Sequence, residues 1–260
     1  MDRYCRFEPR EQRLARLWSQ TAVNEETWTL GDYIGRGESG ARRITNRDGL
    51  TGVAKNAFWH SINGAAHEKI AADLGHQLGI PVPPVALWQQ SDTGSLYSIS
   101  AEAFPQHVSW DQARILGHLT TEFRKNARPI LSAGYLFHAW IGDRDHGENP
   151  GNVVVNTDSS EMRPALAFVD HCLSMSYKGS WFDAPFTVGD GTYYGLRREE
   201  MARDVLKDCV GRIMRLPESE IDTIVRRVPE AYLPQVDADL ICRGLLARRE
   251  QLSTLLVGVG

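Results

Sequence analysis

The segment that most constrains the fold is the apolar run ILSAGYLFHAWIG at residues 130–142. A helix that is apolar on nearly all sides is stable only when other elements surround it, so a buried helix is predicted here. The stretch IGDRDHGENPGN, residues 141–152, holds two Asp, one Glu, one His and two Asn, but its Gly and Pro content excludes regular helix or strand. An apolar β run, GNVVV, follows. Rigid neighbours on both sides make this polar loop a good position for functional groups.

Composition excludes several classes of protein. The chain has 260 residues, of which 42% are hydrophobic and 24% charged, as in a folded soluble protein with one large domain or two lobes. Its net charge of -4 argues against a general nucleic-acid binder. No apolar run is long enough for a membrane span and the first residues lack an apolar signal core, which predicts a cytoplasmic location. The four widely spaced cysteines predict free thiols: Cys5, Cys172, Cys209 and Cys242.

The first half of the chain has mostly strand patterns. A short basic helix or arm is expected at 9–20, and a helix with Asn63 as its cap is expected to end at Gly79. A hairpin is expected where VALWQQ and SLYSISAEAF flank the turn SDTG. The other three expected strands are 27–34, 41–45 and 51–55, the last two joined by the turn NRDG.

The second half has mostly helix patterns. Helical periodicity runs through 110–125, and the last 65 residues also fit helices. Two short β runs, GNVVV and ALAFVD, interrupt this half. The predicted fold class is therefore α+β, with a small β-rich lobe that has one helix and a larger, mostly helical lobe. The expected division is an N-terminal arm at 1–20, an N-lobe at 21–105 and a C-lobe at 106–260.

A glycine-rich turn, GRGESG, lies at residues 35–40. Glycine allows a backbone to approach a phosphate closely, although a sequence with 23 glycines often contains such a pattern as an ordinary turn. A strand rather than a helix follows, so the turn is not a dinucleotide-binding fingerprint. The candidate phosphate-contacting residues are Gly35, Gly37, Ser39 and Gly40.

A lysine and a glutamate follow this turn. Val53 and Lys55 lie two apart on an expected strand and therefore share one face, where Val53 can cover a base and Lys55 can reach phosphates. Glu68 lies on the expected helix beside small residues, so it can pair with Lys55. Each residue alone is also explained as a solvated surface charge, and an exposed pair would contribute only about 0–1 kcal/mol.

The polar loop and the second β run supply oxygen ligands. Asp145 can accept a proton from a hydroxyl nucleophile, and Asn152 can offer a carbonyl oxygen to Mg²⁺. Asp170 follows ALAFV, where its side chain emerges from the end of a strand. A calcium loop is the structural alternative, but the spacing and the distal Glu of such loops are missing. In this order the parts match the needs of phosphoryl transfer, which depends on positioning and charge neutralisation.

The chain resembles the protein-kinase-like fold, and more narrowly the bacterial HipA-like kinases and their phosphatidylinositol 3-/4-kinase-like relatives. The resemblance rests on HEKIAADLGHQLGIPVPPV, YLFHAWIGDRDHGENPGNVVV and ALAFVDHCLSM, and it covers roughly residues 30–255. It implies that Asp145 is the catalytic base, that Asn152 and Asp170 bind magnesium, and that Lys55 contacts phosphate while paired with Glu68. It also implies that SAEAF at 100–104, with Glu102 and Ala103, is a hinge that reads adenine through its backbone.

Two departures from the family pattern leave alternatives open. The family places Asn five residues after the catalytic Asp, whereas Asn149 lies four and Asn152 seven residues after Asp145. Asn149 is therefore the alternative metal ligand, and Asp143 is the alternative base. His171 follows Asp170 where many kinases have Phe, either as a partner of the site or as a packed polar residue.

The predicted function is an ATP–Mg²⁺-dependent kinase that moves the γ-phosphate to a hydroxyl on a protein Ser/Thr, or on a small molecule. One alternative on the same fold is nucleotidyl transfer, in which AMP is moved and pyrophosphate is released. Another is a non-catalytic pseudokinase module. A metal-dependent hydrolase ranks last, because His146 and His171 are not at the spacing of a metal-binding helix. The sequence does not predict the oligomeric state.

Overall fold

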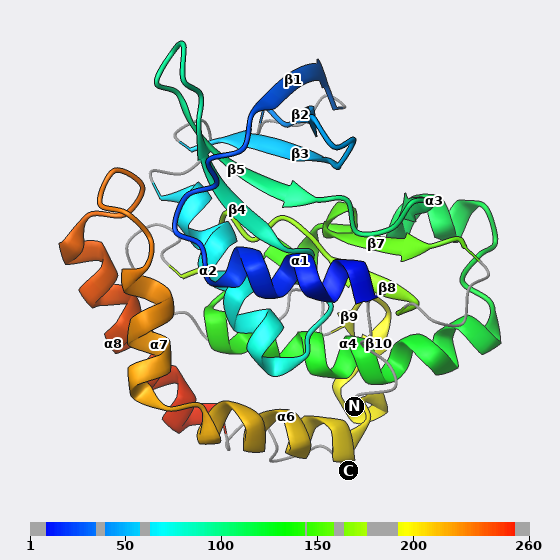
Figure 1. Ribbon diagram of the computed structural model, residues 1–260. Helices are drawn as coiled ribbons and strands as arrows, with labels where there is room; N and C mark the ends of the chain where they lie inside the picture. The colour runs from blue at the N-terminus through cyan, green and yellow to red at the C-terminus, as the bar shows by residue number, and fades with distance from the viewer. Residues whose placement is uncertain are drawn as a thin grey trace.

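The computed structural model describes residues 9–34, 40–57, 63–143, 145–158, 164–175 and 192–252. Its first lobe contains a five-stranded antiparallel sheet in the order β1-β2-β3-β5-β4 (Figure 1). The expected strands are confirmed, with ends shifted by at most three residues. They are β1 Trp28–Tyr33, β2 Arg42–Asn46, β3 Thr51–Asn56, β4 Val85–Gln89 and β5 Leu96–Ala101.

The helix of this lobe, α2 (Gly64–Leu78), ends as predicted. Gly79 closes it in the left-handed conformation, with φ of 68°. Asn63 occupies the N-cap position as expected, but its side chain makes no capping bond. Its amide nitrogen instead donates to Asp237 Oδ2 over 3.0 Å. A tertiary contact with the C-terminal part of the chain therefore replaces the local cap.

The N-terminal helix α1 (Pro9–Ser19) packs across α2 and β4 (Figure 1). The Trp18 ring meets the Trp28 ring edge-on, with 6.1 Å between centroids. Lys69 Nζ donates to the Trp18 carbonyl over 2.7 Å and to the Asp73 carboxylate. Burial favours the neutral forms, so the pKa of Lys69 is lowered and that of Asp73 is raised to about 6. The arm is thus joined to the lobe by buried polar contacts.

The second lobe is mostly helical, as predicted. Two small antiparallel sheets interrupt it, β6-β7-β8 and the hairpin β9-β10. Its helices are α3 Trp110–Ile115, α4 Thr121–Ile141, α5 Asp145–Glu148, α6 Arg203–Arg215, α7 Glu218–Arg226 and α8 Gln235–Gln251. Its strands are β6 His107–Ser109, β7 Val153–Asn156, β8 Leu166–Phe168, β9 Thr192–Tyr193 and β10 Leu196–Arg197, with single 3₁₀ turns at Pro150–Asn152 and Arg198–Glu200.

The periodic segment 110–125 is not one helix. α3 ends at Ile115, and Gly117 takes a φ of 77°, which a helix cannot accommodate. Thr120 then accepts a hydrogen bond from the Phe123 amide over 3.1 Å and caps the start of α4. Capping by Thr120 and the turn at Gly117 therefore divide the segment that periodicity predicts as continuous.

The core is centred on α4, as the apolar run predicts. One buried cluster extends from α2 through α4 to α6, α7 and α8. Gly134 of α4 allows β8 to approach, because a Cβ at this position would lie 2.1 Å from Phe168 Cζ. The strand that carries Asp170 at its end is therefore fixed directly on the buried helix. Among the described residues, no helix combines the length and apolar character that a membrane span requires.

Candidate active site

Lys55 makes two ion pairs, one within its own lobe and one with the second lobe. Its Nζ lies 2.6 Å from Glu68 Oε1 on α2 and 2.7 Å from Asp170 Oδ1 after β8. β3 turns Val53 and Lys55 to the same face, because the alternating residues Gly52 and Ala54 are buried on the other face. Lys55, Glu68 and Asp170 thus meet at one point, although Asp170 lies far from the other two in the sequence.

The charges of this cluster support one another. Burial disfavours a charge on Lys55, but Glu68 and Asp170 outweigh burial and raise the pKa of the ammonium. Burial also opposes ionisation of Asp170, yet Lys55 holds the pKa of that carboxyl well below its usual range. For Glu68, burial raises the pKa and Lys55 counteracts it. A charged lysine between two carboxylates is the consistent state of the cluster.

Asp170 occupies a strained backbone position. Its φ is 68°, a left-handed conformation that costs a residue with a Cβ free energy and that is enriched at functional sites. The conformation lets Asp170 Oδ1 face Lys55 while also accepting from Cys172 Sγ over 3.0 Å. Burial raises the pKa of the Cys172 thiol, and the nearby Asp170 carboxylate raises it further. This cysteine therefore stays a protonated thiol.

The expectation that the polar loop contains no helix is wrong, because the short helix α5 and a 3₁₀ turn form there, and they bring Asp145 and Asn152 together. Asn152 Nδ2 donates to Asp145 Oδ2 over 2.5 Å, and Asn149 Nδ2 lies 3.5 Å from the same oxygen. The Asn152 carbonyl oxygen of the backbone accepts from the Val169 amide over 2.9 Å, directly beside Asp170. Asn152 is buried and adjacent to the strand end, whereas Asn149 is exposed and caps the 3₁₀ turn at Pro150.

Asp143 faces the core instead. Its side chain is fully buried, 3.0 Å from His146 Nδ1, and it accepts from the His146 amide. Burial alone would raise the pKa of Asp143, but His146 lowers it below its ordinary value. A carboxylate in this position is closed to an acceptor hydroxyl, while Asp145 is partly exposed.

Sequence reasoning missed a buried histidine cluster beneath the loop. His138 Nε2 lies 3.2 Å from His171 Nε2, and His138 Nδ1 lies 2.5 Å from the Tyr193 hydroxyl. The His146 ring stacks on His138 at 3.9 Å and on His171 at 4.4 Å. The three histidines each bring one ring nitrogen to within 4.8 Å of the others, and all three side chains are buried. The His171 side chain packs within this cluster rather than against the Lys55 ammonium, and the available signal was His138, the one histidine within the apolar run 130–142.

The other predicted nucleotide-binding residues lie in the glycine-rich turn and in the expected hinge. Gly35, Gly37 and Ser39 lie outside the described residues, whereas Gly40 has a φ of 57°. The Glu102 carboxylate accepts from Thr51 Oγ1 over 2.7 Å, which ties the expected hinge to β3. Ala103 is buried against Ala167 of β8.

The oxygen donors present fit a magnesium ion. Asp170 uses Oδ1 for its contacts with Lys55 and Cys172, and Asn152 uses its amide nitrogen for Asp145. A carboxylate oxygen and an amide oxygen thus remain at neighbouring strand ends, and both are donors that Mg²⁺ prefers. Glu68, Asp170 and Cys172 also cluster, but the Lys55 ammonium already lies between the two carboxylates.

The architecture belongs to the class of protein-kinase-like folds: a five-stranded antiparallel lobe with one helix, followed by a larger helical lobe. Among solved structures, the chain is similar to a Helicobacter pylori proinflammatory kinase, CtkA, with a TM-score of 0.63, 11% identity and coverage of 91% of this chain and 98% of that one. At this identity the similarity shows the fold alone. Comparisons with protein families and with curated proteins found no match.

Two further solved structures were found at lower similarity. One is WaaP in complex with acyl carrier protein, with a TM-score of 0.34, 17% identity and coverage of 95% of this chain and 97% of that one. The other is the maize sucrose-induced receptor kinase 1 domain bound to AMP-PNP, with a TM-score of 0.32, 14% identity and coverage of 96% and 94%. Neither carries the fold assignment, which rests on the CtkA structure.

Proposed function

We propose that the chain is an ATP–Mg²⁺-dependent phosphotransferase that moves the γ-phosphate to a hydroxyl on a protein Ser/Thr. The observation that carries this proposal is the position of Lys55 Nζ, 2.6 Å from Glu68 and 2.7 Å from Asp170. Burial of these charges costs free energy that the ion pairs must offset, so they are weak evidence of a stabilising role, whereas a phosphate-binding site requires a fixed ammonium. The kinase-like fold supports the same reaction class.

Each residue has a role in this proposal. Lys55 contacts the phosphates, and Glu68 holds the lysine in place from α2. Asp145 orients the acceptor hydroxyl and takes its proton, while the amide of Asn152 fixes the Asp145 carboxylate. Asp170 and Asn152 would hold Mg²⁺, which when bound neutralises charge on the phosphates. Asp143 is disfavoured as the base because its carboxylate is enclosed with His146.

The finer assignments belong to the same proposal. Residues 21–105 and 106–260 form the two lobes, with 1–20 as an arm and 100–104 as the adenine-reading hinge. Membership of the HipA-like and phosphatidylinositol-kinase-like group rests on the sequence motifs around the loop and Asp170. Gly35, Gly37, Ser39 and Gly40 would contact phosphates, and Val53 would cover the base.

Replacement of Asp170 tests the proposal. We expect Asp170→Ala to abolish transfer of labelled γ-phosphate from ATP to Ser/Thr acceptors or to the chain itself. Asp92→Ala, in the exposed turn between β4 and β5, is the matched control and should leave transfer unchanged. Unchanged transfer in Asp170→Ala would contradict the metal role.

The released product separates the alternatives. ADP and a phosphorylated product indicate a kinase, whereas pyrophosphate and an AMP-modified product indicate nucleotidyl transfer. Mass spectrometry of the protein after incubation with ATP identifies the transferred group. Calorimetric binding of ATP and Mg²⁺ without any transfer would indicate a pseudokinase, and a folded chain without ATP binding would contradict the nucleotide site itself.

A further inference from the structure

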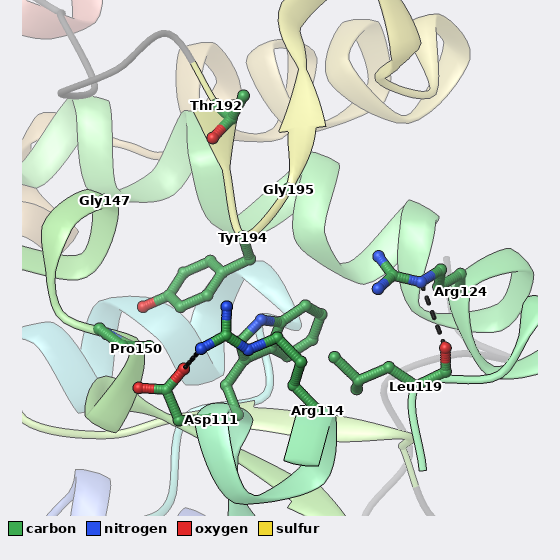
Figure 2. A pocket seen from close by; sticks show the side chains of 10 residues that line it. Asp111, Arg114, Leu119, Arg124, Gly147, Pro150, Thr192, Tyr194 and Gly195 are labelled. Carbon is green, nitrogen blue, oxygen red and sulfur yellow. Dashed lines mark hydrogen bonds and ion pairs between the residues drawn. The ribbon is translucent and has the colours of Figure 1, made fainter. Parts of the chain in front are cut away.

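A second concave site lies beside the loop that carries Asp145 and Asn152. It has a volume of about 610 Å³, is open to solvent, and is bordered by α3, by the segment at Gly147 and Pro150, and by the β9-β10 hairpin (Figure 2). Neither Lys55 nor Asp170 lines it. Its position, sharing one wall with the loop of the proposed base, is that of a site for the acceptor rather than for the nucleotide.

Tyr194 builds the floor of this pocket. It has a φ of 51° and Gly195 has a φ of 79°, so both central residues of the β9-β10 turn are left-handed. That conformation is unfavourable for a tyrosine and persists because the ring is held: it meets the Trp110 ring at 5.5 Å. The Tyr194 hydroxyl donates to the Asn149 carbonyl over 3.3 Å, which fixes the floor to the loop.

Two arginines give the pocket a positive charge. Arg114 of α3 lies 3.1 Å from Asp111, and both side chains are largely exposed. Arg124 of α4 donates through Nε to the Leu119 carbonyl over 3.2 Å, and its terminal nitrogens face the hairpin near Gly195 (Figure 2). The lining holds two arginines against one aspartate, and among the described residues no carboxylate is paired with Arg124. A guanidinium with free terminal nitrogens binds carboxylates bidentately.

Apolar surface continues the pocket along α3. Ile115 and Leu116 are 78% and 62% exposed, and Ile115 follows Asp111 by one helical turn, on the same face. Large exposed apolar residues next to a charged pocket favour an extended occupant over a small free anion. A polypeptide supplies both carboxylates and apolar side chains along one chain.

We propose that this pocket binds an acidic segment of the polypeptide acceptor, with Arg124 and Arg114 contacting its carboxylates and with Trp110 and Tyr194 forming its floor. The inference rests on the proposed phosphotransferase function for the identity of the occupant as the acceptor. It adds the class of substrate: a Ser/Thr segment flanked by Asp or Glu.

Peptide binding tests this proposal without requiring catalysis. The probes are a fluorescein-labelled serine peptide flanked by glutamates and its counterpart flanked by glutamines, measured by fluorescence polarisation on the full chain without ATP. We expect the glutamate peptide to bind at least roughly tenfold more tightly, since each charged hydrogen bond is worth about that factor or more. Arg124→Gln and Arg114→Gln should each remove about tenfold of this preference. Arg47→Gln, at the exposed β2-β3 turn, is the matched control and should change nothing.

Three results would overturn the inference. Equal binding of the two peptides would do so, as would an unchanged preference in both arginine variants. Displacement of the glutamate peptide by inorganic phosphate, but not by chloride at equal ionic strength, would reassign the pocket to a free anion. Circular dichroism of each variant confirms that the chain is folded.

Phosphate transfer distinguishes this inference from the proposed function. If the glutamate preference holds but no transfer occurs, the proposed function fails and the pocket remains an acidic-peptide site. If transfer occurs without any glutamate preference, the proposed function stands and the inference fails. Where both hold, Arg124→Gln should raise KM for acidic peptides while kcat stays unchanged, which is the signature of lost binding.

Discussion

At the scale of single residues, two aspartates in one loop have opposite environments. The Asp143 carboxylate is enclosed with His146, which lowers its pKa against the effect of burial. The Asp145 carboxylate, two positions further, is partly exposed and accepts from Asn152. Both are aspartates in the same polar stretch, so only their surroundings separate a structural carboxylate from a candidate base.

This difference predicts contrasting effects of two conservative substitutions. We expect Asp145→Asn to reduce phosphate transfer by about 10²–10⁴-fold, the usual contribution of a general base, with ATP binding and thermal stability unchanged. Asp143→Asn should instead lower the free energy of unfolding by about 1–3 kcal/mol, because His146 loses a buried charged partner. Radioactive transfer assays and thermal denaturation measure the two effects. Loss of transfer in a fully stable Asp143→Asn variant would exchange the two roles.

At the scale of elements, the contact between α4 and β8 positions the strand end that carries Asp170. Gly134 has no side chain where Phe168 packs, and an added Cβ would lie 2.1–2.8 Å from the ring atoms. The backbone hydrogen bond from the Phe168 amide to the Pro81 carbonyl, 2.9 Å long, fixes β8 on its other side. β8 therefore cannot shift to relieve a clash without moving Asp170.

A glycine-to-alanine pair tests this packing. We expect Gly134→Ala to destabilise the protein by about 1–3 kcal/mol, the usual cost of overpacking a core. Gly211→Ala in α6 is the matched control, since its Cβ would meet only the flexible end of Arg215 at 3.2 Å. Gly211→Ala should be neutral or stabilise by up to about 1 kcal/mol, from helix propensity. Urea denaturation measures both, and equal effects of the two variants would refute the packing argument.

The elements that sequence patterns did not predict are those defined by tertiary contacts. The β9-β10 hairpin has strands of two residues each, too short for a period of two to be visible. The division of 110–125 depends on the positive φ of Gly117, which periodicity does not register. Both features line the pocket beside the loop.

At the scale of the whole molecule, buried neutral histidines from both lobes affect the response to pH. Burial lowers the pKa of His67 to about 4, that of His171 to about 3, and that of His138 well below its ordinary value. Between these lowered pKa values and the ordinary histidine pKa of about 6.5, the folded protein binds fewer protons than the unfolded chain. The histidines therefore stabilise the fold fully above pH 6.5, and this stabilisation is lost as the pH falls. Asp73, with its pKa raised to about 6, and Glu68, whose pKa burial also raises, act in the opposite direction, but they are two groups against three.

We therefore expect the free energy of unfolding to fall as pH decreases from about 6.5 to 4, with His67 alone contributing on the order of 3 kcal/mol over that range. Urea denaturation at pH 7 and pH 5 measures the loss. His67→Gln, which cannot gain a proton, should reduce the difference between the two pH values. A stability that is constant or rises on acidification would contradict the prediction.

The sequence by itself determined most of the local elements, and it identified Lys55, Glu68 and Asp170 as the charged residues of the site. Strand alternation placed Val53 and Lys55 on one face, and the helix ending at Gly79 placed Glu68 within reach. The apolar run 130–142 predicted the buried helix, and ALAFV predicted the strand end that carries Asp170. These predictions succeeded because each depends on the period and burial of a single element or on neighbouring elements.

Only the tertiary structure decided which aspartate faces the core and which asparagine lies beside Asp170. It also decided which side chains form the histidine cluster and the pocket lined by Arg114 and Arg124. Asp143 and Asp145 are chemically identical, and His138, His171 and Tyr193 come from three separate segments. Their contacts depend on the packing of α4, β8 and the β9-β10 hairpin against one another. Local patterns record which face of an element is buried, but not which distant side chain it is buried against.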